Sequence, residues 1–261
     1  MTGAWTFVAD AADDPIVVTA IHAGHDLRTE VNELMVLPDA DRRREEDPYT
    51  DRWTNITGNS VVVARSRFEF DLNRPRERAV YQTPDDAWGL VVWDAELPAP
   101  VLEASLSLYD AFYVELGAMC DAMVERQGHF VLFDLHSYNH RRNGPDGPVA
   151  DPDENPEINI GTRSITDAKW RPAVTAVMEA MRHHPFDGGH LDVRENVKFG
   201  GGNMSRWVNA RYGSTGCSIA IEMKKIFMDE WTDELDENAT VDLGEALAST
   251  ADAVREVLGG S

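Results

Sequence analysis

The chain has 261 residues, of which 43% are hydrophobic and 27% are charged, so it can bury a substantial core and is not expected to be disordered. It carries 24 lysine and arginine residues against 46 aspartate and glutamate residues, which gives a formal net charge of −22. So acidic a surface argues against the phosphate backbone of a nucleic acid as a partner.

The two cysteines, Cys120 and Cys217, lie far apart in the sequence, which predicts a reduced, cytoplasmic protein without a thiolate metal site. Residues 1–14 are acidic and lack a basic segment, and charged residues interrupt every apolar run well before 18 positions. Neither a signal peptide nor a membrane span is therefore expected.

The first half of the chain predicts buried strands and one long helix. Apolar, β-branched runs at residues 15–21 and 60–64 are typical of strands covered on both faces; the second leads into alternating Phe68 and Phe70. Residues 101–126 repeat apolar side chains at spacings of three and four before a glycine stop, which predicts an amphipathic helix. Residues 129–135 then predict a further strand.

The second half begins with a segment rich in Asn, Gly, Pro and Asp at residues 139–159, whose length and flanking strands indicate a functional loop. Ser164 and Asp167 resemble a capping box and Pro172 suits a first helical turn, so a helix to about residue 184 is expected. Residues 217–223 predict a strand, and apolar positions between 243 and 258 predict a closing helix.

This alternation of apolar strands and helices predicts a single α/β domain over residues 1–261, built on a mostly parallel or mixed sheet. In open α/β sheets, ligands bind beyond the carboxyl ends of the strands. His22 and His136 follow two of the predicted strands, and Glu222 lies near the end of a third. We expect these three side chains to meet at one edge of the sheet.

Two imidazoles and a carboxylate are suitable ligands for a catalytic zinc ion, which leaves its fourth position to water. A further carboxylate nearby can take that water's proton. The residues themselves leave the third ligand open. His25 forms a His-x-x-His pair with His22, whereas Glu45, Glu46 and Asp47 form an acidic cluster that could equally be a solvated turn.

An excess of arginine interrupts this acidic chain between residues 65 and 78. Guanidinium groups bind carboxylates through two parallel hydrogen bonds, so the segment is a candidate anion site. Ion pairs with neighbouring acids on the surface would be the simpler alternative, but Asn73 and Arg74 stand side by side before Pro75, which favours the site. The arginines are Arg65, Arg67, Arg74, Arg76 and Arg78.

Five segments, in chain order, share a resemblance to one family. They are Ile21-His-Ala-Gly24, Ser66-Arg-Phe-Glu-Phe-Asp-Leu-Asn-Arg-Pro75, Phe133-Asp-Leu-His-Ser137, Phe199-Gly-Gly-Gly202 and Ile219-Ala-Ile-Glu222. They resemble the N-formylglutamate amidohydrolases, relatives of aspartoacylases and zinc carboxypeptidases, over roughly residues 16 to 230. The resemblance implies a three-layer α/β sandwich of the zinc carboxypeptidase type.

The resemblance also implies roles for individual residues. His22 and His136 would bind zinc, and Glu222 would be the catalytic carboxylate. The position that holds a glutamate ligand in the aspartoacylase and carboxypeptidase relatives is His25 here. The formylglutamate-type pattern therefore favours Asp47 as the third ligand, with Glu46 as the near alternative.

For the substrate, the resemblance implies that Arg67, Asn73 and Arg74 hold a carboxylate or polarise the scissile carbonyl, with Arg67 or Arg74 stabilising the oxyanion. The residues add further candidates for substrate contact. The backbone at Gly201 could approach a ligand closely, and Arg206 and Arg163 could supply anion contacts.

The predicted function is zinc-dependent hydrolysis of the amide bond of a small, acidic N-acyl amino acid, with N-formyl-L-glutamate as the first candidate and formate and glutamate as products. One alternative is a carboxypeptidase-like or aspartoacylase-like hydrolase of another acyl amino acid or short peptide. Another is a metal-free protein that binds an acidic metabolite. In each case the expected partner is a small molecule, with no nucleic acid and no membrane.

Overall fold

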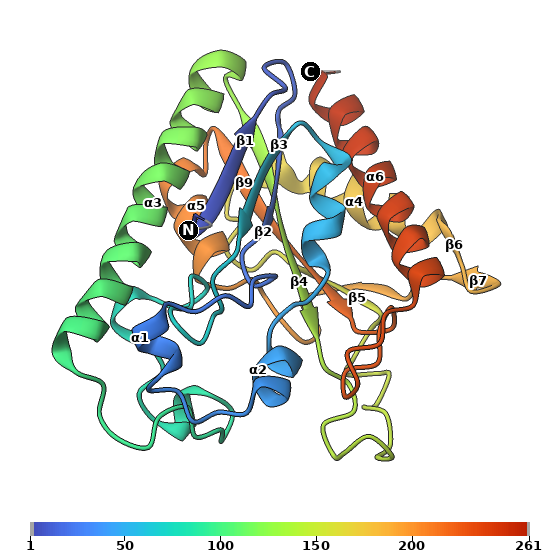
Figure 1. The fold of residues 1–261 in the computed structure, drawn as a ribbon. Coiled ribbons are helices and arrows are strands. Elements are labelled where there is room, and N and C mark those ends of the chain that lie inside the picture. The colour runs from blue at the N-terminus through green and yellow to red at the C-terminus, as the bar shows by residue number, and fades with distance from the viewer. Residues whose placement is uncertain (1–2, 260–261) are drawn as a thin grey trace.

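A computed structural model describes residues 3–259, which form a seven-stranded mixed sheet with helices on both faces (Figure 1). The strand order is β1-β3-β2-β4-β9-β5-β8. β3, β2, β4 and β9 run parallel, whereas β1 is antiparallel to β3 and β5 is antiparallel to β9. The strands are β1 (Trp5–Ala9), β2 (Ile16–Ala20), β3 (Asn59–Val63), β4 (Phe130–Tyr138), β5 (Ile158–Gly161), β8 (Val193–Glu195) and β9 (Gly216–Lys224). The predicted α/β fold with a mixed sheet is confirmed.

Two long helices cover each face of the sheet. α3 (Ala99–Gln127) and α5 (Asn203–Tyr212) pack on one face, and α4 (Arg171–His183) and α6 (Glu237–Gly259) pack on the other (Figure 1). Successive strand side chains point to opposite faces, so Val17 of β2 packs with α3 while Val18 packs with α4 and α6. Burial on both faces explains why β2 is apolar without alternation.

The remaining elements are short. They are the helices α1 (Thr29–Asn32) and α2 (Asp39–Glu45), the hairpin strands β6 (Pro185–Phe186) and β7 (Gly189–His190), and the 3₁₀ helices η1 (Thr50–Ile56), η2 (Arg76–Arg78), η3 (Pro84–Asp86) and η4 (Ala168–Trp170). Within residues 3–259, no helix combines the length and the apolar character needed to cross a membrane.

The predicted strands and helices are present, with three differences. Phe68 and Phe70 do not continue a strand: Phe68 lies in a turn, Phe70 follows the turn, and the two buried rings belong to different apolar clusters. β4 runs on to Tyr138, so His136 lies inside the strand and not after it. Asp167, and not Ser164, caps the helical segment, because its side chain accepts a hydrogen bond from the backbone of Lys169.

β2, β4 and β9 are neighbours and parallel, so their carboxyl ends meet at one edge, in the lower part of Figure 1. His22 follows β2, His136 lies near the end of β4, and Glu222 pairs with His136 in the register between β4 and β9. The sheet topology therefore brings the three predicted side chains to the same edge.

Candidate active site

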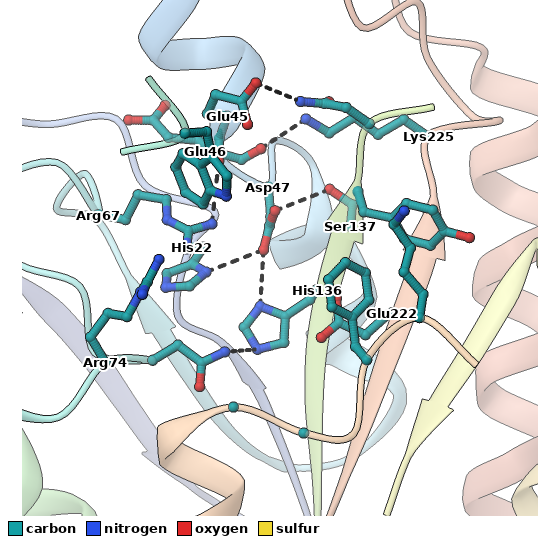
Figure 2. Close-up of a pocket in the computed structure, with 18 of the residues that line it drawn as sticks. His22, Glu45, Glu46, Asp47, Arg67, Arg74, His136, Ser137, Glu222 and Lys225 are labelled. Carbon is teal, nitrogen blue, oxygen red and sulfur yellow. Dashed lines mark hydrogen bonds and ion pairs between the residues drawn. The ribbon is translucent and has the colours of Figure 1, made fainter. Parts of the chain in front are cut away.

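A cavity of about 360 Å3 lies at this edge of the sheet. Its walls come from the ends of β2, β4 and β9, from the turns around α2 and residues 67–74, and from the loop at residues 198–202 (Figure 2). Segments far apart in the sequence thus contribute side chains to one space.

His22, Asp47 and His136 form a buried cluster in this cavity. Oδ2 of Asp47 lies 2.9 Å from Nδ1 of His136 and 3.4 Å from Nδ1 of His22 (Figure 2). The ligands of a tetrahedral zinc ion, each about 2.0–2.1 Å from the metal, lie about 3.3 Å apart, so these separations suit such an ion. Nδ1 of His22 is buried without a hydrogen-bond partner in the part of the chain described, which also suits a metal ligand.

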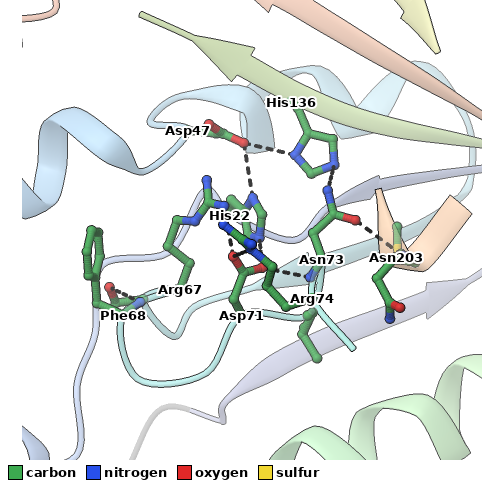
Figure 3. Close-up of polar contacts among 12 residues, drawn as sticks. His22, Asp47, Arg67, Phe68, Asp71, Asn73, Arg74, His136 and Asn203 are labelled. Atoms are coloured by element: carbon green, nitrogen blue, oxygen red, sulfur yellow. Dashed lines mark hydrogen bonds and ion pairs between the residues drawn. The ribbon is translucent and has the colours of Figure 1, made fainter. Parts of the chain in front are cut away.

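A second carboxylate orients each imidazole from its far side. Nε2 of His22 donates to Oδ1 of Asp71 at 2.7 Å (Figure 3). Nε2 of His136 lies 3.0 Å from Oδ1 of Asp134. A carboxylate bound to one ring nitrogen leaves the other nitrogen for a metal. Asp134 precedes His136 by two positions on one strand, so the period of the strand was a signal that could have identified it.

Carboxylates dominate the electrostatics of the cluster. Burial raises the pKa of Asp47, but its contacts with His136 and His22 outweigh burial and hold that pKa below the usual range. Burial lowers the pKa of His136, whereas the carboxylates of Asp134 and Glu222 raise it well above its usual value. An ionised carboxylate therefore faces two imidazole nitrogens.

Glu46 and His25, the alternative third ligands, bind each other and not the cluster. Oε2 of Glu46 accepts a hydrogen bond from Nδ1 of His25 at 2.6 Å, and its Oε1 accepts one from Ser66. The acidic segment is also not a solvated turn, because Glu46 and Asp47 are both buried. Asp47 is the acid of this segment that faces His22 and His136.

Glu222 is a buried carboxylate that lines the cavity beside this cluster. Within residues 3–259 its carboxylate forms no hydrogen bond and no ion pair. Burial raises the pKa of Glu222 to about 7, although the neighbouring His136 acts in the opposite direction. A carboxylate with a pKa near neutrality can both accept and return a proton.

A model of the N-formylglutamate amidohydrolase family matches residues 14–228, which include all of these side chains. The chain belongs to the N-formylglutamate amidohydrolase family. No curated protein matches it.

Two solved structures support the fold of this amidohydrolase. N-formylglutamate amidohydrolase from Ralstonia eutropha is 18% identical, with a TM-score of 0.77 over 98% of this chain and 99% of that one. A gene product of Agrobacterium tumefaciens is also 18% identical, with a TM-score of 0.63 over 98% and 94%. A metallo-carboxypeptidase from Burkholderia cenocepacia is 14% identical, with a TM-score of 0.41 over 97% of this chain and 60% of that one.

Asp71 connects the His22, Asp47 and His136 cluster of this amidohydrolase to the predicted substrate-binding residues. Nη2 of Arg67 donates to Oδ2 of Asp71 at 2.8 Å, and Oδ1 of Asp71 accepts from the backbone N–H of Asn73 at 2.7 Å (Figure 3). Nδ2 of Asn73 in turn lies 3.3 Å from Nε2 of His136. Arg67 and Asn73 are therefore held beside the two histidines.

Arg74 reaches the same cavity with its guanidinium group largely free. It makes a 3.4 Å hydrogen bond to the carbonyl of Asp86 and a 3.9 Å contact with Asp71. The other three arginines of the segment do not line the cavity: Arg76 pairs with Asp110, Arg78 pairs with Asp86, and Arg65 also lies outside its wall. Only part of the arginine-rich segment thus faces the site.

The glycine run packs closely against the site. Gly201 lines the cavity with a φ of 95°, a conformation that favours glycine. A Cβ at Gly202 would collide with the side chain of Asn73. By contrast, Arg163 and Arg206 are not brought to the cavity wall: they are exposed, and they donate to the carbonyls of Asn196 and Gly201.

The residues of the cavity wall that sequence reasoning missed include Trp88, Arg142, Lys198 and Lys225. Lys225 is buried, and its Nζ donates to the carbonyls of Arg44 at 2.6 Å and Glu46 at 2.9 Å. Trp88, with a φ of 54°, lies against the guanidinium of Arg67. All four come from loops or strand exits, where no periodic pattern marks a side chain as functional.

Proposed function

We propose that this chain is a zinc-dependent amidohydrolase that hydrolyses N-formyl-L-glutamate to formate and L-glutamate. The proposal rests on one observation above others: His22, Asp47 and His136 converge with the free carboxylate of Glu222 in a cavity lined by arginines. Membership of the N-formylglutamate amidohydrolase family supports the same reaction. Two buried, free cysteines agree with a cytoplasmic location.

In this proposal, zinc would be held by Nδ1 of His22, a carboxylate oxygen of Asp47 and Nδ1 of His136. When bound, it would supply a Lewis acid that polarises a carbonyl and lowers the pKa of a water molecule. Asp71 and Asp134 hold the two rings in the orientation that this requires.

Glu222 takes a proton from the attacking water and delivers it to the amide nitrogen as the carbon–nitrogen bond breaks. One water is thus consumed: its hydroxyl joins the formyl carbon to give formate, and its proton passes to the amino group of glutamate. Arg67 donates to the carbonyl oxygen as negative charge develops there. Arg74, beside Asn73, receives a carboxylate of the substrate through its planar fork.

The test measures formate and glutamate released by zinc-loaded protein. We expect equal amounts of both products from N-formyl-L-glutamate, loss of activity after chelation, and recovery when zinc is restored. N-acetyl-L-aspartate and a dipeptide with a carboxyl-terminal glutamate test the aspartoacylase-like and peptidase-like alternatives. Hydrolysis of either compound without hydrolysis of N-formyl-L-glutamate would overturn the proposed substrate.

A further inference from the structure

The cavity carries more cationic than acidic side chains, although the chain as a whole has a net charge of −22. A local excess of cations in an acidic protein indicates an anionic ligand, because the cations would otherwise be paired with the abundant acids. Along the described part of the wall, the cations are Arg67, Arg74, Arg142, Lys198 and Lys225, and the acids are Glu45, Glu46, Asp47 and Glu222.

Three of the five cations already have partners in the site. Arg67 and Arg74 gather around Asp71, next to His22. Lys225 is bound to two backbone carbonyls. Arg142 and Lys198 remain, and neither takes part in the chemistry proposed above.

Lys198 has no acidic partner in the part of the chain that the structure describes. Its Nζ donates to the side-chain oxygen of Asn155 and lies 5.4 Å from the ring centre of Tyr138. Its backbone N–H donates to Oδ1 of the buried Asn159 at 2.8 Å, and Asn159 pairs in register with Glu222 of β9. Lys198 is thus fixed to the wall that carries Glu222. Figure 2 shows Glu222 and Arg74 on opposite sides of His136.

Arg142 is only loosely paired. Its two terminal nitrogens lie 3.4 and 3.3 Å from the carboxylate oxygens of Glu45. Charge-assisted hydrogen bonds are typically about 2.7–2.9 Å long. Glu45 is held more closely by Arg44, at 2.9 Å. The side chain of Arg142 is 48% exposed, so its guanidinium group can turn toward a ligand.

Arg142 and Lys198 also repel each other. Burial lowers the pKa of Lys198, and the charge of Arg142 lowers it further. Two cations that line the same cavity are stabilised when an anion binds beside them.

We propose that Arg142 and Lys198 form the subsite for the side-chain carboxylate of the substrate, while Arg74 and Asn73 receive its α-carboxylate. The inference rests on the proposed function. In an N-acyl amino acid the α-carboxylate is close to the scissile bond, and Asn73 lies 3.3 Å from His136, so that pair suits the nearer group. The subsite makes the enzyme selective for dicarboxylic N-acyl amino acids over their side-chain amides.

The experiment compares three substrates: N-formyl-L-glutamate, N-formyl-L-glutamine, and N-formyl-L-glutamate carrying an α-amide. Lys198→Met and Arg142→Met should each reduce the preference in kcat/KM for glutamate over glutamine by about 10- to 100-fold, the usual effect of losing a hydrogen bond to a charged group. Their preference for the free α-carboxylate over the α-amide should change far less.

Matched controls are Arg141→Met and Lys224→Met, which remove the same charges from neighbouring residues outside the cavity wall. Both should retain the preference for glutamate. Equal losses on the glutamate and glutamine substrates in Lys198→Met and Arg142→Met would overturn the subsite. A loss of the preference for the free α-carboxylate over the α-amide would also overturn the subsite, because these two residues would then bind the α-carboxylate.

A binding measurement distinguishes failure of the subsite from failure of the proposed function. If the zinc-loaded wild-type protein releases no formate from any of the three compounds, the proposed function fails. Calorimetric titration with glutarate and its monoamide then still tests the subsite. Tighter binding of glutarate that disappears in Lys198→Met supports the subsite, and equal binding of the two compounds by the wild-type protein overturns it.

Discussion

The hydrogen-bond partners of each side chain distinguish the residues suited to bind a cation from the residue suited to transfer a proton. The imidazoles of His22 and His136 each have a carboxylate at Nε2, which directs Nδ1 toward Asp47. Glu222 has no such partner among the described residues, and burial raises its pKa. The two imidazoles are thus fixed in orientation, whereas the carboxylate of Glu222 is free to exchange a proton.

Replacing either histidine by alanine should therefore remove the metal. We expect His22→Ala and His136→Ala to contain far less zinc than the wild-type protein after purification without added metal, as measured by elemental analysis. His183→Ala is a suitable control, since His183 is exposed on α4. Stoichiometric zinc in a correctly folded His22→Ala or His136→Ala protein would show that the replaced residue is not a ligand.

Glu222→Gln should separate catalysis from metal binding. The amide keeps the shape of the side chain but cannot accept the proton, so kcat should fall by about 100-fold or more. Zinc content should stay at the wild-type level, because Glu222 is not among the three clustered ligand atoms. An activity close to wild type, or loss of zinc, would each contradict the proposed role.

Among the elements, β9 and α2 are tied together by Lys225. This buried lysine follows β9 directly and donates to carbonyls on both sides of Glu45, at the end of α2. The backbone N–H of Asp47 is fixed from the other direction by the carbonyl of His22, at 2.9 Å. The turn that presents Asp47 is thus held between two strands.

Lys225→Met should loosen this turn and weaken zinc binding about tenfold, as measured by competition with a chelator. Stability should also fall by about 1–3 kcal/mol, because two buried carbonyls lose their donor. Lys224→Met, one position earlier, is the control. A lower melting temperature with an unchanged dissociation constant for zinc would mean that Lys225 stabilises the fold without positioning Asp47.

Across the whole molecule, charge repulsion opposes folding. The excess of 46 acidic over 24 basic residues leaves carboxylates that cannot all be paired. The Debye screening length shortens from about 10 Å at 0.1 M salt to about 3 Å at 1 M salt, so salt should weaken this repulsion.

The melting temperature should therefore rise between 0.1 M and 1 M potassium chloride, by about 2–4 °C for each kcal/mol of repulsion removed. Differential scanning calorimetry measures this rise, and sucrose at matched osmolality controls for effects of water activity. A melting temperature that falls with salt would show that attractive ion pairs dominate the electrostatics of the folded chain.

The sequence by itself determined the elements and the residues that stand at their ends. Apolar runs and spacings of three and four marked the strands and the long helices, because local periodicity reflects which faces are buried. His22, His136 and Glu222 followed from their positions near the ends of apolar strands, since parallel strands place their carboxyl ends at one edge. These inferences needed only short stretches of chain.

Tertiary structure decided which of the nearby acids faces the histidines. The residue types alone left His25, Glu46 and Asp47 open, and the family resemblance favoured Asp47; in the structure, His25 pairs with Glu46 and Asp47 faces His136. Arg142 and Lys198 were identified in the same way, because both line the cavity from loops that carry no periodic signal. Contacts between distant segments depend on how the whole chain packs, which a local pattern does not contain.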